Sequence, residues 1–484
     1  MSNTQGTRAT YQTIGLILGP AVALALTFMD APDGMTADTW KVVSLAAWMA
    51  IWWASEAIPV AATALLPLIF LPMTGISTAK EASTPYTNPV IFLLMGGFII
   101  AMAMQRWGLH RRIALNILAR VGDHPTALIA GFMATAALLS MWISNTATTL
   151  MMIPIAMSVA EAVSGKRDVS NSFTIALLLG IAYSASIGGL GTIVGTPPNA
   201  MLVGYLKEQM DVDIGFTQWM AFGVPVVLVM VPAAWFVLTK LTFKLNAADG
   251  HAGEEEVQSQ LKDIGPISVP EKRVAYLFGA VALAWMFRPL LDDLPFMGGL
   301  SDMVIAVMGA VLAFVIPAGD QQRQGVALLS WEWAVRLPWG VILLFGGGLS
   351  LAAAISSTGL ALWLGDALAF LTTYDLIFLM LATVAMVIFL TELTSNTATV
   401  AALLPVLAAI ATKGNFDPIL MSAPAAMAAS CAFMLPVATG PNAVVFSGGQ
   451  VTVPDMARAG FRLNIIGIFL VTTLCYALVP LIFT

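Results

Sequence analysis

The sequence predicts an all-α polytopic membrane protein, and two observations carry this prediction. The chain is 59% hydrophobic and 10% charged, whereas roughly 25% of the residues in soluble domains are charged. Apolar runs close to the length that a bilayer requires, about 17–25 residues, recur from end to end, for example at 88–105 and 462–483. A β-barrel would instead show alternating segments of about 10 residues. Near-continuous apolar runs in lipid require helices, which satisfy their own backbone groups.

The apolar runs define the elements in chain order. Eleven spans are expected near residues 13–29, 41–55, 57–72, 88–105, 174–190, 217–239, 274–288, 302–318, 338–357, 420–437 and 462–483. No small-residue cleavage site follows the first run, so we interpret it as a span and not as a signal peptide. Cys431 and Cys475 both lie in apolar segments, which predicts no disulfide.

The Lys and Arg residues are unevenly divided between the predicted loops. With the N-terminus inside, sixteen of the 21 basic residues fall in inside loops, and the outside loops hold Lys41, Lys80, Lys207, Arg288 and Lys413. Cytoplasmic loops carry an excess of Lys and Arg. We therefore expect an integral protein of the bacterial inner (plasma) membrane, with its N-terminus in the cytoplasm and its C-terminus outside.

The two halves of the chain resemble each other. Matching residues are separated by 250 or 251 positions in three cases and by 243 in a fourth: Gly96-Gly97 and Gly346-Gly347, Gly108-Leu109 and Gly359-Leu360, Ser144 and Ser395, Pro198-Asn199 and Pro441-Asn442. Because about five spans and one odd loop separate the halves, the second repeat is inverted, as in secondary transporters. We assign residues 1–40 to an N-terminal segment and first span, 41–243 to the first repeat, 244–272 to a cytoplasmic linker and 273–484 to the second repeat.

Segments 108–120 and 359–371 correspond in the two repeats. The first has a basic and an apolar face, which suits a helix lying in the membrane interface. Either these helices are arms between a fixed and a moving part, or they simply pack in the interface.

The pentapeptide Ser-Asn-Thr-Ala-Thr occurs twice, at 144–148 and 395–399, near the middle of the apolar stretches 126–163 and 376–411. Such polarity at membrane depth is tolerated where protein, water or a bound solute satisfies it. Each stretch fits a re-entrant hairpin, although two full spans would give the same topology. The second arm would aim backbone N–H groups and the positive end of its dipole at the tip. The two matching tips therefore predict one anion site built from two halves.

Each half also contains a Gly/Pro-rich break, within 174–206 and within 420–449. The breaks end in Gly-Thr-Pro-Pro-Asn (195–199) and Thr-Gly-Pro-Asn (439–442). Pro removes donors, so carbonyls near Gly195 and Ala438 become free to coordinate a cation. No Lys, Arg or His lies in the clusters or breaks, so bound cations would have to neutralise the anion. Glu392 beside the second cluster replaces Met141 of the first, and it either supports a cation site or pairs with a hydroxyl.

The paired Ser-Asn-Thr motifs, the two Pro-Asn breaks and the inverted repeat resemble the divalent anion:sodium symporters, the INDY-type dicarboxylate transporters, over nearly the whole chain. The resemblance implies a homodimer in membrane lipid, with a scaffold domain and a transport domain of two hairpins and two broken helices that moves as an elevator. It also implies import of C4-dicarboxylates such as succinate, fumarate and malate, or of citrate, with two or more co-transported Na⁺ ions.

The resemblance further implies the site residues. Sodium site one would consist of Ser140, Ser144, Asn145 and the Gly195 carbonyl, and sodium site two of Thr391, Thr394, Asn396 and the Ala438 carbonyl. The substrate carboxylates would contact Asn145, Thr146, Asn396 and Thr397, with Thr196, Pro198 and Thr439 nearby. A contact from Gly440, which stands where the first break has Pro197, is left open.

Four rival functions remain. A sulfate or other inorganic-anion symporter would use the same helix tips. A dicarboxylate exchanger would replace a sodium with a basic side chain, and none lies beside these motifs. A passive channel would conduct without stoichiometric sodium. An intramembrane enzyme is disfavoured, because the sequence has no HExxH, no Walker A pattern and no membrane-depth His beside a serine. We expect no catalytic residues, organic cofactor or nucleic-acid partner.

Overall fold

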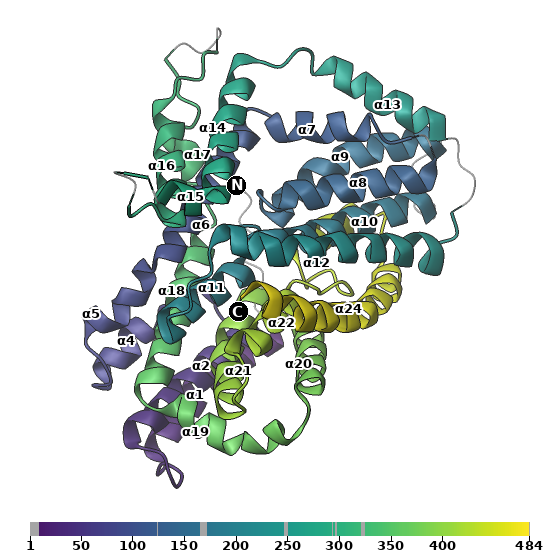
Figure 1. Cartoon of the computed structure of the whole chain (residues 1–484). Coiled ribbons are helices and arrows are strands. Elements are labelled where there is room, and N and C mark those ends of the chain that lie inside the picture. The colour runs from purple at the N-terminus through teal and green to yellow at the C-terminus, as the bar shows by residue number, and fades with distance from the viewer. Residues whose placement is uncertain are drawn as a thin grey trace.

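The computed structural model describes residues 9–122, 124–164, 172–245, 250–292, 294–295, 298–320 and 325–483. Throughout these residues the regular structure is helical, which confirms the predicted fold class (Figure 1). Eight helices in the described part are long and apolar enough to cross a membrane, and five shorter apolar helices accompany them. The number of eleven spans stays a prediction.

In the first half, the helices begin and end near the predicted runs. They are α1 (Thr10–Phe28), α2 (Ala37–Ser55), α3 (Val60–Thr63), α4 (Leu66–Met73), α5 (Ala79–Ser83), η1 (Thr84–Thr87), α6 (Pro89–Arg106), α7 (Leu109–Leu118), α8 (Pro125–Ser140), α9 (Asn145–Ser164), α10 (Ser172–Gly188), η2 (Gly189–Gly191), α11 (Pro197–Met210), α12 (Phe216–Phe236) and η3 (Val237–Thr242).

The remaining helices follow the linker. They are α13 (Gly250–Asp263), α14 (Val269–Met286), α15 (Arg288–Asp292), α16 (Asp302–Val315), α17 (Trp331–Ala334), α18 (Trp339–Ser357), α19 (Leu360–Ala367), η4 (Ala369–Thr373), α20 (Leu376–Thr391), α21 (Asn396–Lys413), α22 (Pro418–Ala429), α23 (Gly440–Ser447) and α24 (Val453–Ile482).

One group of helices carries the motifs. Helices α8 and α9 pack against α10, and α20 and α21 pack against α22. The long helices α12 and α24 contact each other, and α23 of the second half contacts α9 and α10 of the first (Figure 1). The two halves of the chain therefore interlock around the motif-bearing helices.

A second group lies beside the first, with α1 on α2, α14 and α6 on α16, and α18 on α3 and η1. The repeated glycine pairs allow close packing here. A Cβ at Gly96 would lie 2.6 Å from the backbone of Ala306, and a Cβ at Gly347 would lie 2.2 Å from the Ala64 carbonyl. Gly97, next to Gly96 on α6, faces Val194 of the first break. Helices α6 and α18 thus bring the second group against the motif-bearing helices.

The two short helices expected in the interface are α7 and α19. Gly108 and Gly359 precede them with φ of 72° and 79°, a left-handed conformation that glycine adopts without steric cost. Arg112 on α7 forms a partly buried ion pair with Glu271, Nε to Oε1 2.7 Å, and donates to the Gly265 carbonyl at 2.8 Å. Helix α7 is therefore fixed to the start of α14.

The structure differs from the predicted elements in three places. The expected span 57–72 is two helices, because Pro67 is accepted only in the first turn of a new helix. The linker 244–272 contains α13, which packs on α9 and α7 and buries Val257. The expected span 420–437 ends at Ala429, so the second break is longer than its Gly/Pro motif.

Candidate functional site

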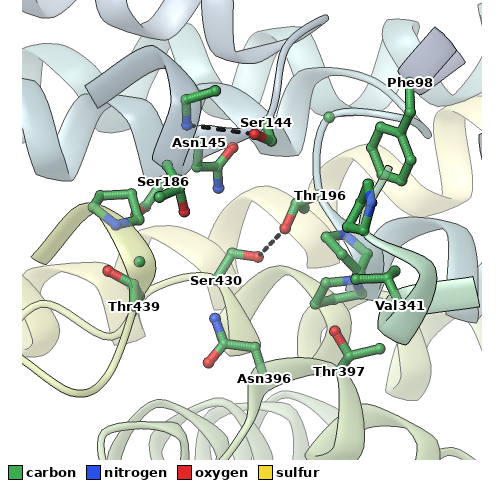
Figure 2. Close-up of a pocket in the computed structure, with 18 of the residues that line it drawn as sticks. Phe98, Ser144, Asn145, Ser186, Thr196, Val341, Asn396, Thr397, Ser430 and Thr439 are labelled. Carbon is green, nitrogen blue, oxygen red and sulfur yellow. Dashed lines mark hydrogen bonds between the residues drawn. The ribbon is translucent and has the colours of Figure 1, made fainter. Parts of the chain in front are cut away.

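A cavity of about 710 Å³ brings the two clusters and the two breaks together (Figure 2). Ser144 and Asn145 lie on one side of it, Asn396 and Thr397 on another, and Thr196 and Ser430 between them. Ten of the predicted site residues line it: Ser144, Asn145, Thr146, Gly195, Thr196, Pro198, Asn396, Thr397, Ala438 and Thr439. Ser140, Thr391 and Thr394 are not part of the lining.

Both clusters lie where one hairpin arm ends and the next begins. Helix α8 ends at Ser140 and α9 starts at Asn145, and α20 ends at Thr391 and α21 starts at Asn396. The Ser144 hydroxyl accepts a weak bond from the Ala147 N–H at 3.4 Å. The first turns of α9 and α21 therefore present backbone N–H groups and positive dipole ends to the cavity, which suits an anion.

Two of the predicted ligands of sodium site one, Ser140 and the Gly195 carbonyl, surround the side-chain amide of Asn145, whereas Ser144 contacts the Ala147 N–H instead. One terminal atom of this amide lies 2.7 Å from Ser140 Oγ, 3.2 Å from the Gly195 carbonyl and 3.3 Å from the Ala185 carbonyl. Because all three neighbours are acceptors, nitrogen fits this position and donates to them; a cation bound here would require the amide oxygen in its place. Hard alkali cations prefer such oxygen clusters.

The second set is assembled less fully. The hydroxyl of Thr391 donates to the Val387 carbonyl at 2.9 Å, and that of Thr394 contacts Thr399 Oγ1 at 2.8 Å. Buried Asn396 Oδ1 lines the same cavity and has no hydrogen-bond partner among the described residues. Threonine hydroxyls in helices commonly donate to a carbonyl four residues earlier, which uses the proton and leaves the lone pairs of the oxygen free.

The asparagines of the two Pro-Asn motifs hydrogen-bond the backbone of the breaks. No role was assigned to them from the sequence. Asn199 Nδ2 donates to the carbonyls of Gly189 at 3.0 Å and Thr192 at 2.8 Å. Asn442 Nδ2 donates in the same way to those of Ala432 at 3.3 Å and Leu435 at 3.0 Å. Each asparagine replaces helical hydrogen bonds that its break lacks. The repeated Pro-Asn dipeptide was the sequence signal for this role.

Two serines that no motif indicated also line the cavity. Ser430 Oγ lies 3.4 Å from Thr196 Oγ1 and so joins the two breaks. Buried Ser186 Oγ has no partner among the described residues. An unpaired buried hydroxyl costs free energy, so Ser186 is a natural contact for a bound solute.

Comparison with known proteins identifies the family. Residues 10–483 match the family described as the sodium:sulfate symporter transmembrane region. This chain belongs to the sodium:sulfate symporter family. It is therefore a membrane transporter that couples anions to sodium, and the family expected from the motifs is confirmed.

Individual relatives agree with this assignment. The chain is 40% identical over 476 residues to the sodium-dependent dicarboxylate transporter SdcS of Staphylococcus saprophyticus, covering 97% of this chain and 92% of that one. It is 39% identical over 478 residues to SdcS of Staphylococcus aureus, with the same coverage. The YdaH transporter of Alcanivorax borkumensis shares the fold, with a TM-score of 0.60 at 14% identity and 97% coverage of both chains.

Among the described residues of this sodium:sulfate symporter family member, two charged residues line the cavity, Glu56 and Arg336. Both are exposed. The Arg336 guanidinium lies 4.5 Å from the centre of the Trp333 ring, in a cation–π contact. Glu56 lies just after the end of α2, at the rim of the cavity. The polar tips themselves carry no charged side chain.

Glu392 does not line the cavity, and of the two roles that the sequence left open, pairing with a hydroxyl is not observed among the described residues. Its carboxylate accepts the backbone N–H groups of Phe433, Met434 and Leu435 at 2.8–3.1 Å. The amide of Asn464 on α24 donates to it at 2.7 Å. Each contact lies 41–72 residues away in sequence, which is why local reasoning could not find it.

Proposed function

We propose that this protein imports C4-dicarboxylates such as succinate, fumarate and malate together with sodium. The convergence of both Ser-Asn-Thr tips on one cavity is the observation that carries the proposal. Two helix N-termini can bind the two carboxylates of one molecule, and a cavity of about 710 Å³ is in the usual range for small-ligand sites, about 300–1,000 Å³. The printed names of the SdcS relatives support the same substrate class.

Sodium ions would neutralise the dianion. Site one would use Ser140, Ser144, Asn145 and the Gly195 carbonyl, and the oxygens of Ser140, Gly195 and Ala185 that gather around the Asn145 amide support it. Site two would use Thr391, Thr394, Asn396 and the Ala438 carbonyl, supported by the unpartnered Asn396 Oδ1. An unneutralised charge is costly to bury, so sodium binding would precede the dianion and couple the two fluxes.

The motif-bearing helices would move as an elevator against the group that contains α6 and α18, within a homodimer. The packing of the helices into two groups, with the close glycine contacts of Gly96 and Gly347 inside the second group, supports such a division. The exposed cavity residues Glu56 and Arg336 belong to loops predicted to be cytoplasmic, so this conformation would be inward-facing. Residues 41–243 and 273–484 would form the inverted repeats.

The test is uptake of radiolabelled succinate into proteoliposomes under an inward sodium gradient, compared with equal potassium and choline gradients. We expect saturable uptake that requires sodium, and Ser144→Ala should chiefly raise the sodium concentration for half-maximal rate. Uptake only after internal succinate loading would indicate an exchanger. Uptake of sulfate or citrate, but not of succinate, would identify a different anion as substrate.

Gly440 provides a prediction on substrate affinity. A Cβ at this position would lie 2.0 Å from Thr146 Oγ1, so Gly440→Ala should displace that hydroxyl from the cavity. Because a hydrogen bond to a charged group contributes about 1.5–3 kcal/mol, we expect the KM for succinate at saturating sodium to rise about tenfold or more. The measurement is sodium-saturated uptake as a function of succinate.

The matched control is Gly340→Ala, whose Cβ would meet Ala61 Cβ at 3.4 Å, an ordinary contact. The control should keep the wild-type KM. An unchanged KM in Gly440→Ala would show that Thr146 does not contact the substrate.

A further inference from the structure

The backbone N–H groups of the second break are satisfied differently from those of the first. In the first half, residues 189–191 form a short 3₁₀ helix, η2, which pairs part of the break within itself. In the second half no regular helix forms between Ala429 and Gly440. The N–H groups of this segment therefore need other acceptors, because unpaired backbone groups at membrane depth are costly.

The Glu392 side chain supplies these acceptors. Its two oxygens accept four contacts from three consecutive N–H groups, with Phe433 at 2.8 Å, Met434 at 2.9 and 3.1 Å and Leu435 at 3.0 Å. Glu392 is 3% exposed. A buried carboxylate is stabilised when several donors surround it, and Met141 at the matching position of the first half could accept none of these bonds.

Helix α24 holds the same segment from its other side. A Cβ at Gly460 would lie 2.2 Å from the Phe433 carbonyl, so the helix touches the segment's backbone directly. Asn464, one turn later, donates its amide to Glu392 Oε1 at 2.7 Å. The unwound segment is thus enclosed between the hairpin arm α20 and α24.

A short chain of hydrogen bonds connects this anchor to the cavity. The Leu435 N–H donates to Glu392, and the Leu435 carbonyl accepts from the Ala438 N–H at 3.2 Å and from Asn442 Nδ2 at 3.0 Å. Ala438 and Thr439 line the cavity. The direction of the Ala438 carbonyl therefore depends on where residues 433–435 are held.

We propose that Glu392 is a positioning residue for the second sodium site: through residues 433–435 it orients the Ala438 carbonyl without itself contacting the ion or the substrate. This rests on the proposed function, since it assumes that the Ala438 carbonyl is a sodium ligand. The positioning role of Glu392 would affect the second sodium site and not the contacts to the dianion. Disturbing Glu392 should weaken sodium binding and leave the dianion contacts at the helix tips in place.

The test uses Glu392→Gln, which keeps the shape but replaces one acceptor oxygen with a donor that faces backbone N–H groups. A lost hydrogen bond to a charged group corresponds to about tenfold or more in an equilibrium constant, so we expect the sodium concentration for half-maximal succinate uptake to rise about tenfold. The KM for succinate at saturating sodium should stay within about twofold. Glu255→Gln, on the exposed face of α13, is the matched control and should change neither.

A purely structural role would lower the melting temperature equally with and without sodium and leave the sodium dependence of uptake unchanged, which would overturn the proposal. Asn464→Ala keeps the carboxylate and removes one of its donors. It should raise the sodium concentration for half-maximal uptake by less, about threefold. If Glu392→Gln does not fold, this variant tests the positioning role instead. No shift in Asn464→Ala would then contradict the proposal.

Two reference variants separate this inference from the proposed function. Thr391→Val and Asn396→Ala remove predicted ligands of the second sodium site directly. If both leave the sodium dependence unchanged, the proposed site is wrong whatever Glu392 does. If both shift it and Glu392→Gln does not, the site stands and the positioning role of Glu392 is wrong.

Discussion

Asn145→Ala is expected to abolish sodium-driven succinate uptake. The Asn145 amide is within 2.7–3.3 Å of Ser140, Gly195 and Ala185, and it also lines the cavity beside Thr146. The substitution would remove a ligand from both the cation and the dianion. Because each contact to a charged group contributes about 1.5–3 kcal/mol, losing two should lower uptake at limiting sodium by about 100-fold or more.

The measurement is initial uptake over a range of sodium concentrations, with protein abundance and melting temperature determined in parallel. Asn116→Ala is the matched control, because Asn116 on α7 donates to the Arg112 carbonyl at 2.8 Å and does not line the cavity. It should transport like the wild type. Sodium-dependent uptake near the wild-type level in Asn145→Ala would refute the first sodium site.

Gly195→Ala is expected to have a comparably large effect through the backbone. A Cβ at Gly195 would lie 2.4 Å from the Gly189 carbonyl oxygen and 2.9 Å from Gly189 Cα. Neither neighbour is a flexible side chain, so the break itself would have to change shape. The Gly195 carbonyl would then turn away from Asn145. Both proposed ligands would be misplaced, so we expect sodium-driven uptake to fall about 100-fold, as for the loss of two contacts to a charged group.

The protein should nevertheless fold, because overpacking costs about 1–3 kcal/mol and native stabilities are about 5–15 kcal/mol. The decisive readout is the stabilisation of the melting temperature by sodium, which should disappear in Gly195→Ala. Gly279→Ala on α14 is the control, since its Cβ would meet no atom within 4 Å. A sodium-induced shift equal to that of the wild type would show that the Gly195 carbonyl is not a ligand.

The elements of the site could be predicted because their causes are local. The Ser-Asn-Thr clusters interrupt apolar stretches, and the structure ends α8 and α20 just before them and starts α9 and α21 within them. The Gly/Pro breaks interrupt their helices for the same local reason, the loss of donors and of helix propensity. Ser186 and Ser430 carry no such signal, since a single serine in an apolar helix has many possible neighbours.

The sequence by itself determined the fold class, the family, the helix ends at the tips and ten of the residues that line the cavity. Lipid offers no hydrogen bonds, so each segment has to satisfy its backbone groups internally as a helix. Polar clusters and Gly/Pro breaks that interrupt a helix therefore stand out within the apolar runs of the sequence. Only the tertiary structure decided that Ser186, Ser430, Arg336 and Glu56 line the cavity between the tips and that Glu392 holds residues 433–435. Helices that are apolar on every face do not indicate by their pattern which neighbour each face contacts, so those pairings depend on packing across the whole molecule.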